Sequence, residues 1–254
     1  MYKRQGLEAH DLSSWCLFGC FGAPIPLPLL EDAATRLPCR VMPGWGMSEV
    51  ALLTTTRPTD PPEKTVTTDG VPFPGCEVMV LDEEGKEARR GDEGDLVCRG
   101  VADFVGYVQG RAFTEACYTA DGWFTTGDRA RMDEDGFIRI TGRTKDLIIR
   151  GGENVPVKEI EDVLVRHPRV AGVAVVAVPD DRLGEIGCAC VLADGEPPTL
   201  DELRDLLRDA GVTTQFWPER LVVVDEFPTT PSGKVQKYRL RERLTSPAAR
   251  VGSG

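Results

Sequence analysis

The hydrophobic residues of the first eighty positions form short runs that alternate with a helical stretch. Apolar runs at residues 15–18 and 39–42 flank the stretch Leu27–Arg36. A strand, a helix and a second strand in this order are typical of a βαβ unit, whose two strands are parallel. We therefore predict part of a parallel sheet between Trp15 and about Val80.

Between residues 76 and 140 the pattern changes to short strands joined by turns. The predicted strands cover residues 77–81, 95–98 and 137–140, and the last follows the turn sequence Asp133-Glu134-Asp135-Gly136. Asp and Gly in such a turn favour a hairpin. This region is predicted to be a β-rich subdomain.

The chain after Arg143 predicts a small α+β unit. Its clearest helix begins at Leu200, because Thr199 and Glu202 have the spacing of a capping box and Gly211 follows the last apolar residue of the stripe. The other predicted elements are a helix at 158–166, strands at 170–178, 187–192 and 221–224, and a basic segment at 234–243.

Composition limits the classes of partner. With 254 residues, 41% of them hydrophobic, the chain can bury the core of one large or two modest domains. A net charge of −11 argues against a nucleic-acid partner, because a polyanion would be repelled. Since no apolar run is long enough to span a bilayer and no signal-peptide pattern opens the chain, we expect a soluble, cytoplasmic protein without a transmembrane segment.

The cysteines indicate buried thiols rather than a metal site. There are eight, with no Cys-x-x-Cys pair and only two histidines, so zinc-ligand spacing is absent. Cys188 and Cys190 alternate along a predicted strand and therefore share one face. We interpret them as packing residues, with a redox pair as the less favoured alternative.

One glycine-rich segment carries a combination of side chains suited to nucleotide chemistry. Residues 43–49 read Pro-Gly-Trp-Gly-Met-Ser-Glu and follow a predicted strand. Glycines let the backbone approach a ligand, Trp45 can stack on adenine, Ser48 can bond a phosphate or acyl oxygen, and Glu49 can hold Mg²⁺. Taken alone, the segment is equally compatible with a structural turn.

The segment resembles the Tyr-Gly-Met-Thr-Glu motif of the adenylate-forming superfamily, which contains acyl-CoA synthetases, luciferases and peptide-synthetase adenylation domains. Five further segments resemble motifs of that family in the same order along the chain. They are Phe21-Gly22-Ala23-Pro24, residues 94–100 with Gly106-Tyr107, residues 122–128 (Gly-Trp-Phe-Thr-Thr-Gly-Asp), residues 142–146 with 151–154, and residues 228–234, which end in Ser-Gly-Lys. The resemblance covers nearly everything from Gly6 to about Leu244.

The resemblance implies a mixed α/β and α+β architecture. Residues 6–142 would be the C-terminal portion of a large AMP-binding domain with a mixed sheet and a β-barrel-like part. Residues 143–146 would be a hinge that pivots at Lys145, residues 147–245 a small mobile α+β domain, and residues 246–254 a disordered tail.

The resemblance also implies the cofactors ATP, Mg²⁺ and coenzyme A and a set of site residues. Lys234, Ser48 and Glu49 would take part in catalysis, with Glu49 as the metal ligand. Nucleotide and coenzyme A contacts would come from Gly22, Ala23, Pro24, Gly44, Trp45, Gly46, Met47, Ser48, Asp128, Ile140, Arg143, Gly151, Gly152 and Glu153.

Three of these residues have a plainer reading beside the functional one. Asp128 could accept hydrogen bonds from ribose hydroxyls or merely cap a turn. Arg143 offers a guanidinium fork for ribose or phosphate oxygens, or forms a surface ion pair. Lys234 follows Gly233 as in a nucleotide P-loop, but Pro228 and Val235 break that motif, so we interpret Lys234 as the family's catalytic lysine.

Two departures from the family pattern affect the interpretation. The Ser/Thr/Gly-rich loop that ends in Pro-Lys-Gly and cradles the β and γ phosphates does not occur in these 254 residues. We therefore expect a chain truncated on its N-terminal side, with little activity alone. Phe21 stands where the family usually has glycine, which affects the fit of the nucleotide.

The sequence thus predicts an ATP-dependent ligase that joins a small carboxylic acid to coenzyme A through an acyl-adenylate. The amino-acid sequence of residues 150–157 is similar to that of short- or medium-chain and alicyclic acyl-CoA ligases. The alternatives are an acyl-AMP ligase or adenylation domain that loads a carrier protein, which is less favoured because no carrier segment follows, and a non-catalytic fragment that binds AMP or coenzyme A.

Overall fold

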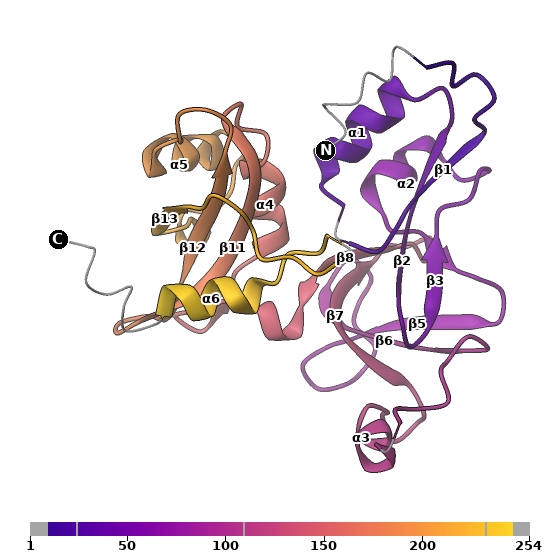
Figure 1. The fold of residues 1–254 in the computed structure, drawn as a ribbon. Coiled ribbons are helices and arrows are strands. Elements are labelled where there is room, and N and C mark those ends of the chain that lie inside the picture. The colour runs from indigo at the N-terminus through magenta and orange to yellow at the C-terminus, as the bar shows by residue number, and fades with distance from the viewer. Residues whose placement is uncertain (1–9, 24, 109, 232, 246–254) are drawn as a thin grey trace.

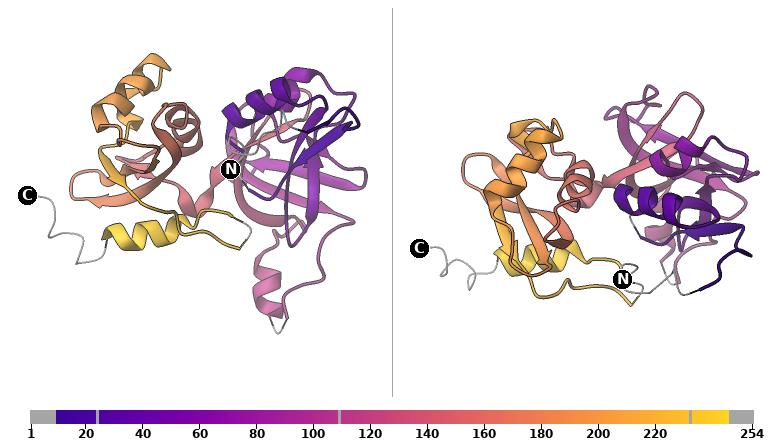
Figure 2. Two further views of the ribbon diagram at one scale, coloured as in Figure 1. Left: turned by 45° about the horizontal axis from the view of Figure 1, so that its top comes forward. Right: turned by 90° about the horizontal axis from the view of Figure 1, so that it is seen from above.

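The computed structural model describes residues 10–23, 25–108, 110–231 and 233–245. Two lobes lie side by side (Figure 1), and they remain separate when the molecule is turned (Figure 2). The larger lobe holds the elements from β1 to β8, and the smaller lobe holds those from α4 to α6. The predicted hinge lies where the chain leaves the larger lobe, in the 3₁₀ turn η3 (Thr144–Asp146), and whether the lobes move about it stays a prediction.

The first sheet of the larger lobe has the order β1-β2-β3-β4. Strands β1 (Leu17–Cys20) and β2 (Arg40–Met47) are parallel, and α1 (Leu27–Arg36) connects them, which confirms the βαβ prediction. The rest of the sheet differs from the prediction. Strands β3 (Ala51–Thr55) and β4 (Val71–Pro72) pair antiparallel, because a three-residue turn after Met47 is too short for a parallel crossover. Helix α2 (Pro62–Thr67) lies between β3 and β4 in sequence.

The second sheet is an antiparallel meander of β5 (Cys76–Leu81), β6 (Glu93–Gly100), β7 (Phe124–Met132) and β8 (Ile138–Arg143). Its order is β5-β6-β7-β8. The sheet is open, so the barrel-like part of the prediction is realised as a curved meander and not as a closed barrel. Helix α3 (Arg111–Ala116) projects from the connection between β6 and β7 (Figure 1).

The smaller lobe is a sheet covered by helices, as predicted. Strands β11 (Val170–Asp180) and β12 (Gly184–Ala193) form its long central hairpin, and β13 (Arg220–Val223) pairs parallel with β12. The short hairpin of β9 (Ile149–Arg150) and β10 (Glu153–Asn154) extends the other side of β12. The helices are α4 (Val157–Leu164), α5 (Leu200–Asp209) and α6 (Lys237–Thr245), with a 3₁₀ turn at η4 (Thr214–Phe216).

Local signals in the smaller lobe translate directly into structure. The Thr199 hydroxyl accepts the Glu202 backbone N–H while the Glu202 carboxylate accepts the Thr199 N–H, which confirms the predicted capping box. Leu203 and Leu207 are buried on the core side of α5. Cys188 and Cys190 are both buried in the apolar cluster between the sheet and α6, which confirms the packing interpretation.

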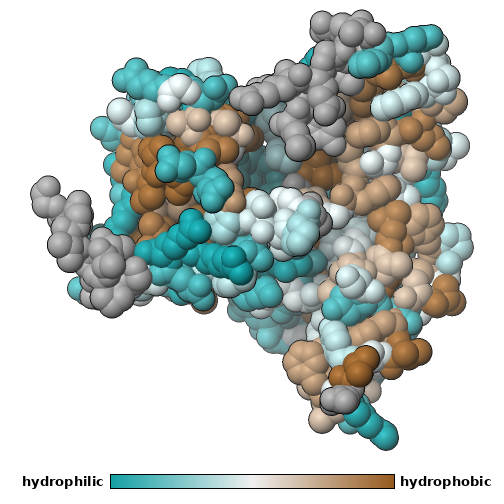
Figure 3. Space-filling model, viewed as in Figure 1, coloured by the Kyte–Doolittle hydropathy of each residue, from teal (hydrophilic) through white to brown (hydrophobic). Residues whose placement is uncertain are grey.

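On the face shown in Figure 3, hydrophilic residues follow α6, and apolar residues gather beside it on the smaller lobe and along the larger lobe. The described residues contain no helix long and apolar enough to cross a bilayer.

Candidate functional site

Three predicted site residues from three strands meet in one buried cluster. The Trp45 indole N–H donates to Asp128 Oδ2 at 2.8 Å, and Arg143 Nε donates to Asp128 Oδ1 at 2.9 Å. Asp128 is 5% exposed and Trp45 7% exposed. The carboxylate is therefore fixed by one neutral and one cationic donor, and we refer to Trp45, Asp128 and Arg143 as the carboxylate cluster.

Strand register brings this cluster together. In the β7–β8 pairing Asp128 lies directly opposite Arg143, so the two side chains point to the same face of the sheet. The Thr126 hydroxyl accepts the Asp128 backbone N–H and donates to the Leu96 carbonyl, which fixes the local backbone. Sequence reasoning gave Thr126 no role, because its bond to Leu96 joins residues thirty positions apart.

Trp45 enters from the other sheet, between two glycines that its strand requires. A Cβ at Gly44 would collide with the Thr54 carbonyl, and one at Gly46 with the backbone of Ala51. These glycines therefore allow close backbone approach between β2 and β3, as the motif suggested. Met47 ends β2 and packs against the core under the second sheet.

Lys234 belongs to the smaller lobe and lies near enough to the carboxylate cluster for the charges of Arg143 and Asp128 to shift its pKa. Its loop is a tight turn, in which the Lys234 N–H donates to Thr230 Oγ1 at 3.1 Å and Thr229 pairs with Val235. The stretch before α6 reaches from the smaller lobe toward the larger lobe, and in Figure 1 it ends near β8 (Figures 1 and 2). Burial lowers the pKa of the Lys234 amine and nearby Arg143 lowers it further, while Asp128 raises it. A cation is thus held half-buried beside the carboxylate cluster.

Ser48 and Glu49 lie in the turn after β2. Ser48 is exposed, and Glu49 Oε1 accepts the Tyr107 hydroxyl at 2.8 Å. That hydrogen bond raises the pKa of Tyr107 to about 12, so the phenol stays a donor at neutral pH. Tyr107 is a site residue without a role in the sequence interpretation, although its Gly-Tyr motif was visible there.

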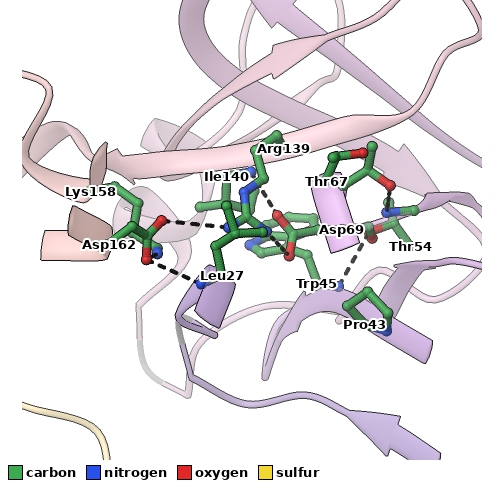
Figure 4. A network of polar contacts seen from close by, with 12 residues as sticks. Leu27, Pro43, Trp45, Thr54, Thr67, Asp69, Arg139, Ile140, Lys158 and Asp162 are labelled. Carbon is green, nitrogen blue, oxygen red and sulfur yellow. Dashed lines mark hydrogen bonds and ion pairs between the residues drawn. The ribbon is translucent and has the colours of Figure 1, made fainter. Parts of the chain in front are cut away.

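Ile140 is tied to a buried carboxylate that no motif announced. The Ile140 N–H donates to Asp69 Oδ2 at 2.8 Å, and Arg139 Nη1 lies 3.5 Å from Asp69 Oδ1 (Figure 4). Burial raises the pKa of Asp69, and Arg139 opposes that shift. Asp69 therefore holds β8 against the first sheet.

The segment after β1 is only partly described. Gly22 has a positive φ of 92° and, like Ala23, is exposed, whereas Pro24 lies outside the described residues. The Phe21 ring lies across the glycines of both parallel strands, 3.0 Å from the position of a Cβ on Gly44. The departure at Phe21 thus covers backbone that glycine would leave open.

The glycine loop, residues 151–153, forms hydrogen bonds with residues other than those of the carboxylate cluster. Gly151 and Gly152 both have positive φ and join β9 to β10. In the described chain, Gly151 N–H donates to the Leu183 carbonyl and Glu153 accepts from the Gln215 amide, so both partners belong to the smaller lobe. These hydrogen bonds therefore do not connect the glycine loop to Lys234.

Known proteins are similar in sequence to this chain along almost its whole length. The profile of AMP-binding enzymes matches residues 2–108, and that of the AMP-binding enzyme C-terminal domain matches residues 159–234. The medium-chain fatty-acid–CoA ligase of Escherichia coli is 37% identical over 93% of this chain and 42% of its own length. The 2,3-dihydroxybenzoate-AMP ligase of Bacillus subtilis is 36% identical over 92% of this chain and 44% of its own length.

Solved structures agree. ATP-bound MatB from Rhodopseudomonas palustris is 33% identical and superposes with a TM-score of 0.84 over 91% of this chain and 46% of its own. Apo MatB, compared over the same shares, gives a TM-score of 0.68. The chain spans less than half the length of these relatives. It belongs to the adenylate-forming superfamily of AMP-binding enzymes and corresponds to their C-terminal half.

Proposed function

We propose that this chain is the C-terminal part of an ATP-dependent carboxylic acid–CoA ligase. In the first half-reaction a carboxylate oxygen attacks the α-phosphorus of ATP, the bond to the bridging oxygen breaks, and pyrophosphate leaves. In the second, the thiolate of coenzyme A attacks the acyl carbon and AMP leaves. The observation that carries the proposal is the carboxylate cluster, with Lys234 near it.

Asp128 has the free capacity that a ribose needs. A carboxylate offers about four acceptor positions, and Trp45 and Arg143 use one on each oxygen. One position on each oxygen is left for the two ribose hydroxyls. Because Asp128 is held from both sides, little reorganisation is needed when the nucleotide binds.

Lys234 and Arg143 would stabilise the charge that develops during adenylation. Both half-reactions pass through states with negative charge on phosphoryl or acyl oxygens. A half-buried ammonium group is poorly solvated, so an anionic oxygen beside it gains more than it would in water. By analogy with other preorganised donors, Lys234 contributes about 3 kcal/mol to the transition state.

Glu49 fits the Mg²⁺ that this chemistry uses. Tyr107 occupies one of its oxygens, and Mg²⁺ is commonly held by one or two carboxylates together with substrate phosphates. The described residues contain no group of three or more acidic, His or Cys side chains that could hold a metal ion. In the proposed site, substrate phosphates would supply further ligands. The ion would supply neutralisation of triphosphate charge.

The lobe arrangement supports assigning this structure to the adenylation step. The same neighbour, MatB, fits better in its ATP-bound than in its apo structure, with TM-scores of 0.84 and 0.68. For the second half-reaction, the small domain would rotate at the hinge 143–146, so that the loop Gly151-Gly152-Glu153 replaces the Lys234 loop. Gly22, Ala23, Pro24 and Ile140 would contribute to the nucleotide pocket.

The acceptor of the acyl group is the finer part of the proposal. The name of the E. coli relative supports coenzyme A, and residues 150–157 resemble those of acyl-CoA ligases. The 2,3-dihydroxybenzoate-AMP ligase, at nearly equal identity, favours the second candidate, an acyl-AMP ligase that loads a carrier protein.

The test uses the completed enzyme, defined as this chain joined to the N-terminal half of a relative, which carries the family's phosphate loop. It is incubated with ATP, Mg²⁺ and a panel of short- and medium-chain acids, with either coenzyme A or a phosphopantetheinylated carrier protein. We expect acyl-CoA and AMP in stoichiometric amounts. Acyl-AMP that reacts only with the carrier would establish the second candidate, and no acyl-AMP with any acid would refute both.

A further inference from the structure

A partly buried carboxylate of the smaller lobe binds the larger lobe. Asp162 lies on α4 and its side chain is 16% exposed. Asp162 Oδ1 accepts the Leu27 backbone N–H at 3.2 Å, and Oδ2 lies 3.8 Å from Arg139 Nη2 (Figure 4). Leu27 and Arg139 both belong to the larger lobe.

The contact with Leu27 completes a helix end that has no local cap. The N-cap position of α1 is Pro26, which has no side-chain acceptor, and the first turn contains no acidic residue. The first N–H groups of a helix need acceptors, and a carboxylate there also interacts favourably with the helix dipole. Asp162 therefore acts as the missing cap of α1 from the other lobe.

The contact with Arg139 joins Asp162 to the tryptophan of the carboxylate cluster. Arg139 also pairs with Asp69, whose backbone carbonyl accepts the Thr54 hydroxyl at 2.8 Å. Thr54 Oγ1 in turn accepts the backbone N–H of Trp45 at 3.3 Å (Figure 4). A continuous chain of polar contacts thus runs from α4 to the strand that carries Trp45.

Two other ion pairs between the lobes are more exposed. Arg131 pairs with Glu159 at 3.2 Å, and Arg166 pairs with Glu31 at 3.2 Å, and all four side chains are 44–54% exposed. Exposed pairs contribute little because water and salt screen them. Of these three interlobe carboxylates, Asp162 has the least exposed side chain.

We propose that Asp162 is a latch that holds the lobes in the arrangement where Lys234 lies near the carboxylate cluster. The proposal rests on the lobe rotation of the proposed function, during which the contacts of Asp162 with Leu27 and Arg139 must break. Release leaves no bare charge, because Lys158 on the same helix turn pairs with Asp162 and moves with it. A contact that retains a partner after release can break and re-form in each cycle.

The test uses the 254-residue chain itself, without nucleotide. Pro26 and Pro28 have no N–H, so the amide signal of residues 26–28 reports Leu27 alone. Hydrogen exchange at Leu27 and the acetylation rate of Lys234 by acetic anhydride are measured by mass spectrometry. The variants are Asp162→Ala, the isosteric Asp162→Asn, and Arg166→Ala as the matched interlobe control.

We expect Asp162→Ala to speed exchange at Leu27 about 10-fold or more, as for loss of a charged hydrogen-bond partner, and to raise the acetylation rate of Lys234. Arg166→Ala should leave both rates near wild type. Protection of β11 and β12, which lie within the smaller lobe, reports its integrity. If Asp162→Ala lowers the protection of β11 and β12, the test uses Asp162→Asn instead. We then expect hydrogen exchange at Leu27 to be about threefold faster than in the wild type.

An unchanged rate at Leu27 or at Lys234 in the folded variant would overturn the latch. Because neither readout involves turnover, that failure is separate from failure of the proposed function. A completed enzyme that forms no acyl-AMP would refute the function and leave the latch measurement intact.

Discussion

Replacing Asp128 by Asn tests the proposed ribose site with little change of shape. The carboxylate holds two donors, at 2.8 and 2.9 Å, and is 5% exposed. An amide can accept from only one side, so a position for one ribose hydroxyl is lost and the other bonds lose their ionic character. Hydrogen bonds to charged groups are worth about 1.5–3 kcal/mol each, which corresponds to about 10- to 150-fold in affinity.

The assay is titration of the chain with AMP and with 2′,3′-dideoxy-AMP, followed by Trp fluorescence or calorimetry. Wild type should prefer AMP by at least the factor above, and Asp128→Asn should lose most of that preference because its affinity for AMP falls. Asp95→Asn is the matched control, because Asp95 pairs with Arg129 on the same sheet but is 51% exposed. The reasoning is refuted if Asp128→Asn lowers affinity for both nucleotides by the same factor, since Asp128 would then be structural.

Three further outcomes follow from the site. In the completed enzyme, Gly152→Leu should spare adenylate formation and block thioester formation. Gly195→Leu, at another positive-φ glycine of the smaller lobe, controls for backbone strain. Equal loss of thioester formation in the two variants would contradict the proposed role of the loop. Lys234→Met should raise the melting temperature at pH 7 and lose that advantage toward pH 10.5. Burial lowers the pKa of Lys234 in the folded state, so the unfolded state binds the proton better and the stability of the wild type rises with pH in that window. A difference in melting temperature that stays constant between pH 7 and 10.5 would contradict this. Tyr107→Phe should raise the Mg²⁺ concentration for half-maximal adenylation about fivefold, the effect of one lost hydrogen bond of about 1 kcal/mol to Glu49, and an unchanged Mg²⁺ requirement would argue against Glu49 as the ligand.

Local chemistry explains where sequence reasoning succeeded. The capping box at Thr199 and the βαβ unit around α1 depend on residues close in the chain, and both formed as predicted. The meeting of Trp45, Asp128 and Arg143 was implied by family resemblance, and strand register supplies its physical cause.

The unpredicted features depend on residues far apart in sequence. Asp162 and Leu27 are 135 positions apart, and no local pattern indicates that α1 takes its cap from another lobe. The sequence of residues 6–14 can be interpreted as the end of a helix, but its described part, residues 10–14, is not helical. There Asp11 accepts the Ser13 N–H in a tight turn, a local bond that competes with helix formation.

The most direct test of the central claim separates the two half-reactions of the completed enzyme with Lys234→Ala. Adenylation is followed by ATP–pyrophosphate exchange, and thioester formation by supplying preformed acyl-adenylate and coenzyme A. We predict that adenylation falls about 10²–10³-fold, the usual loss for one charge-stabilising donor, while thioester formation stays near wild type. Parallel loss of both half-reactions, or loss of neither, would contradict the assignment of Lys234 to adenylation.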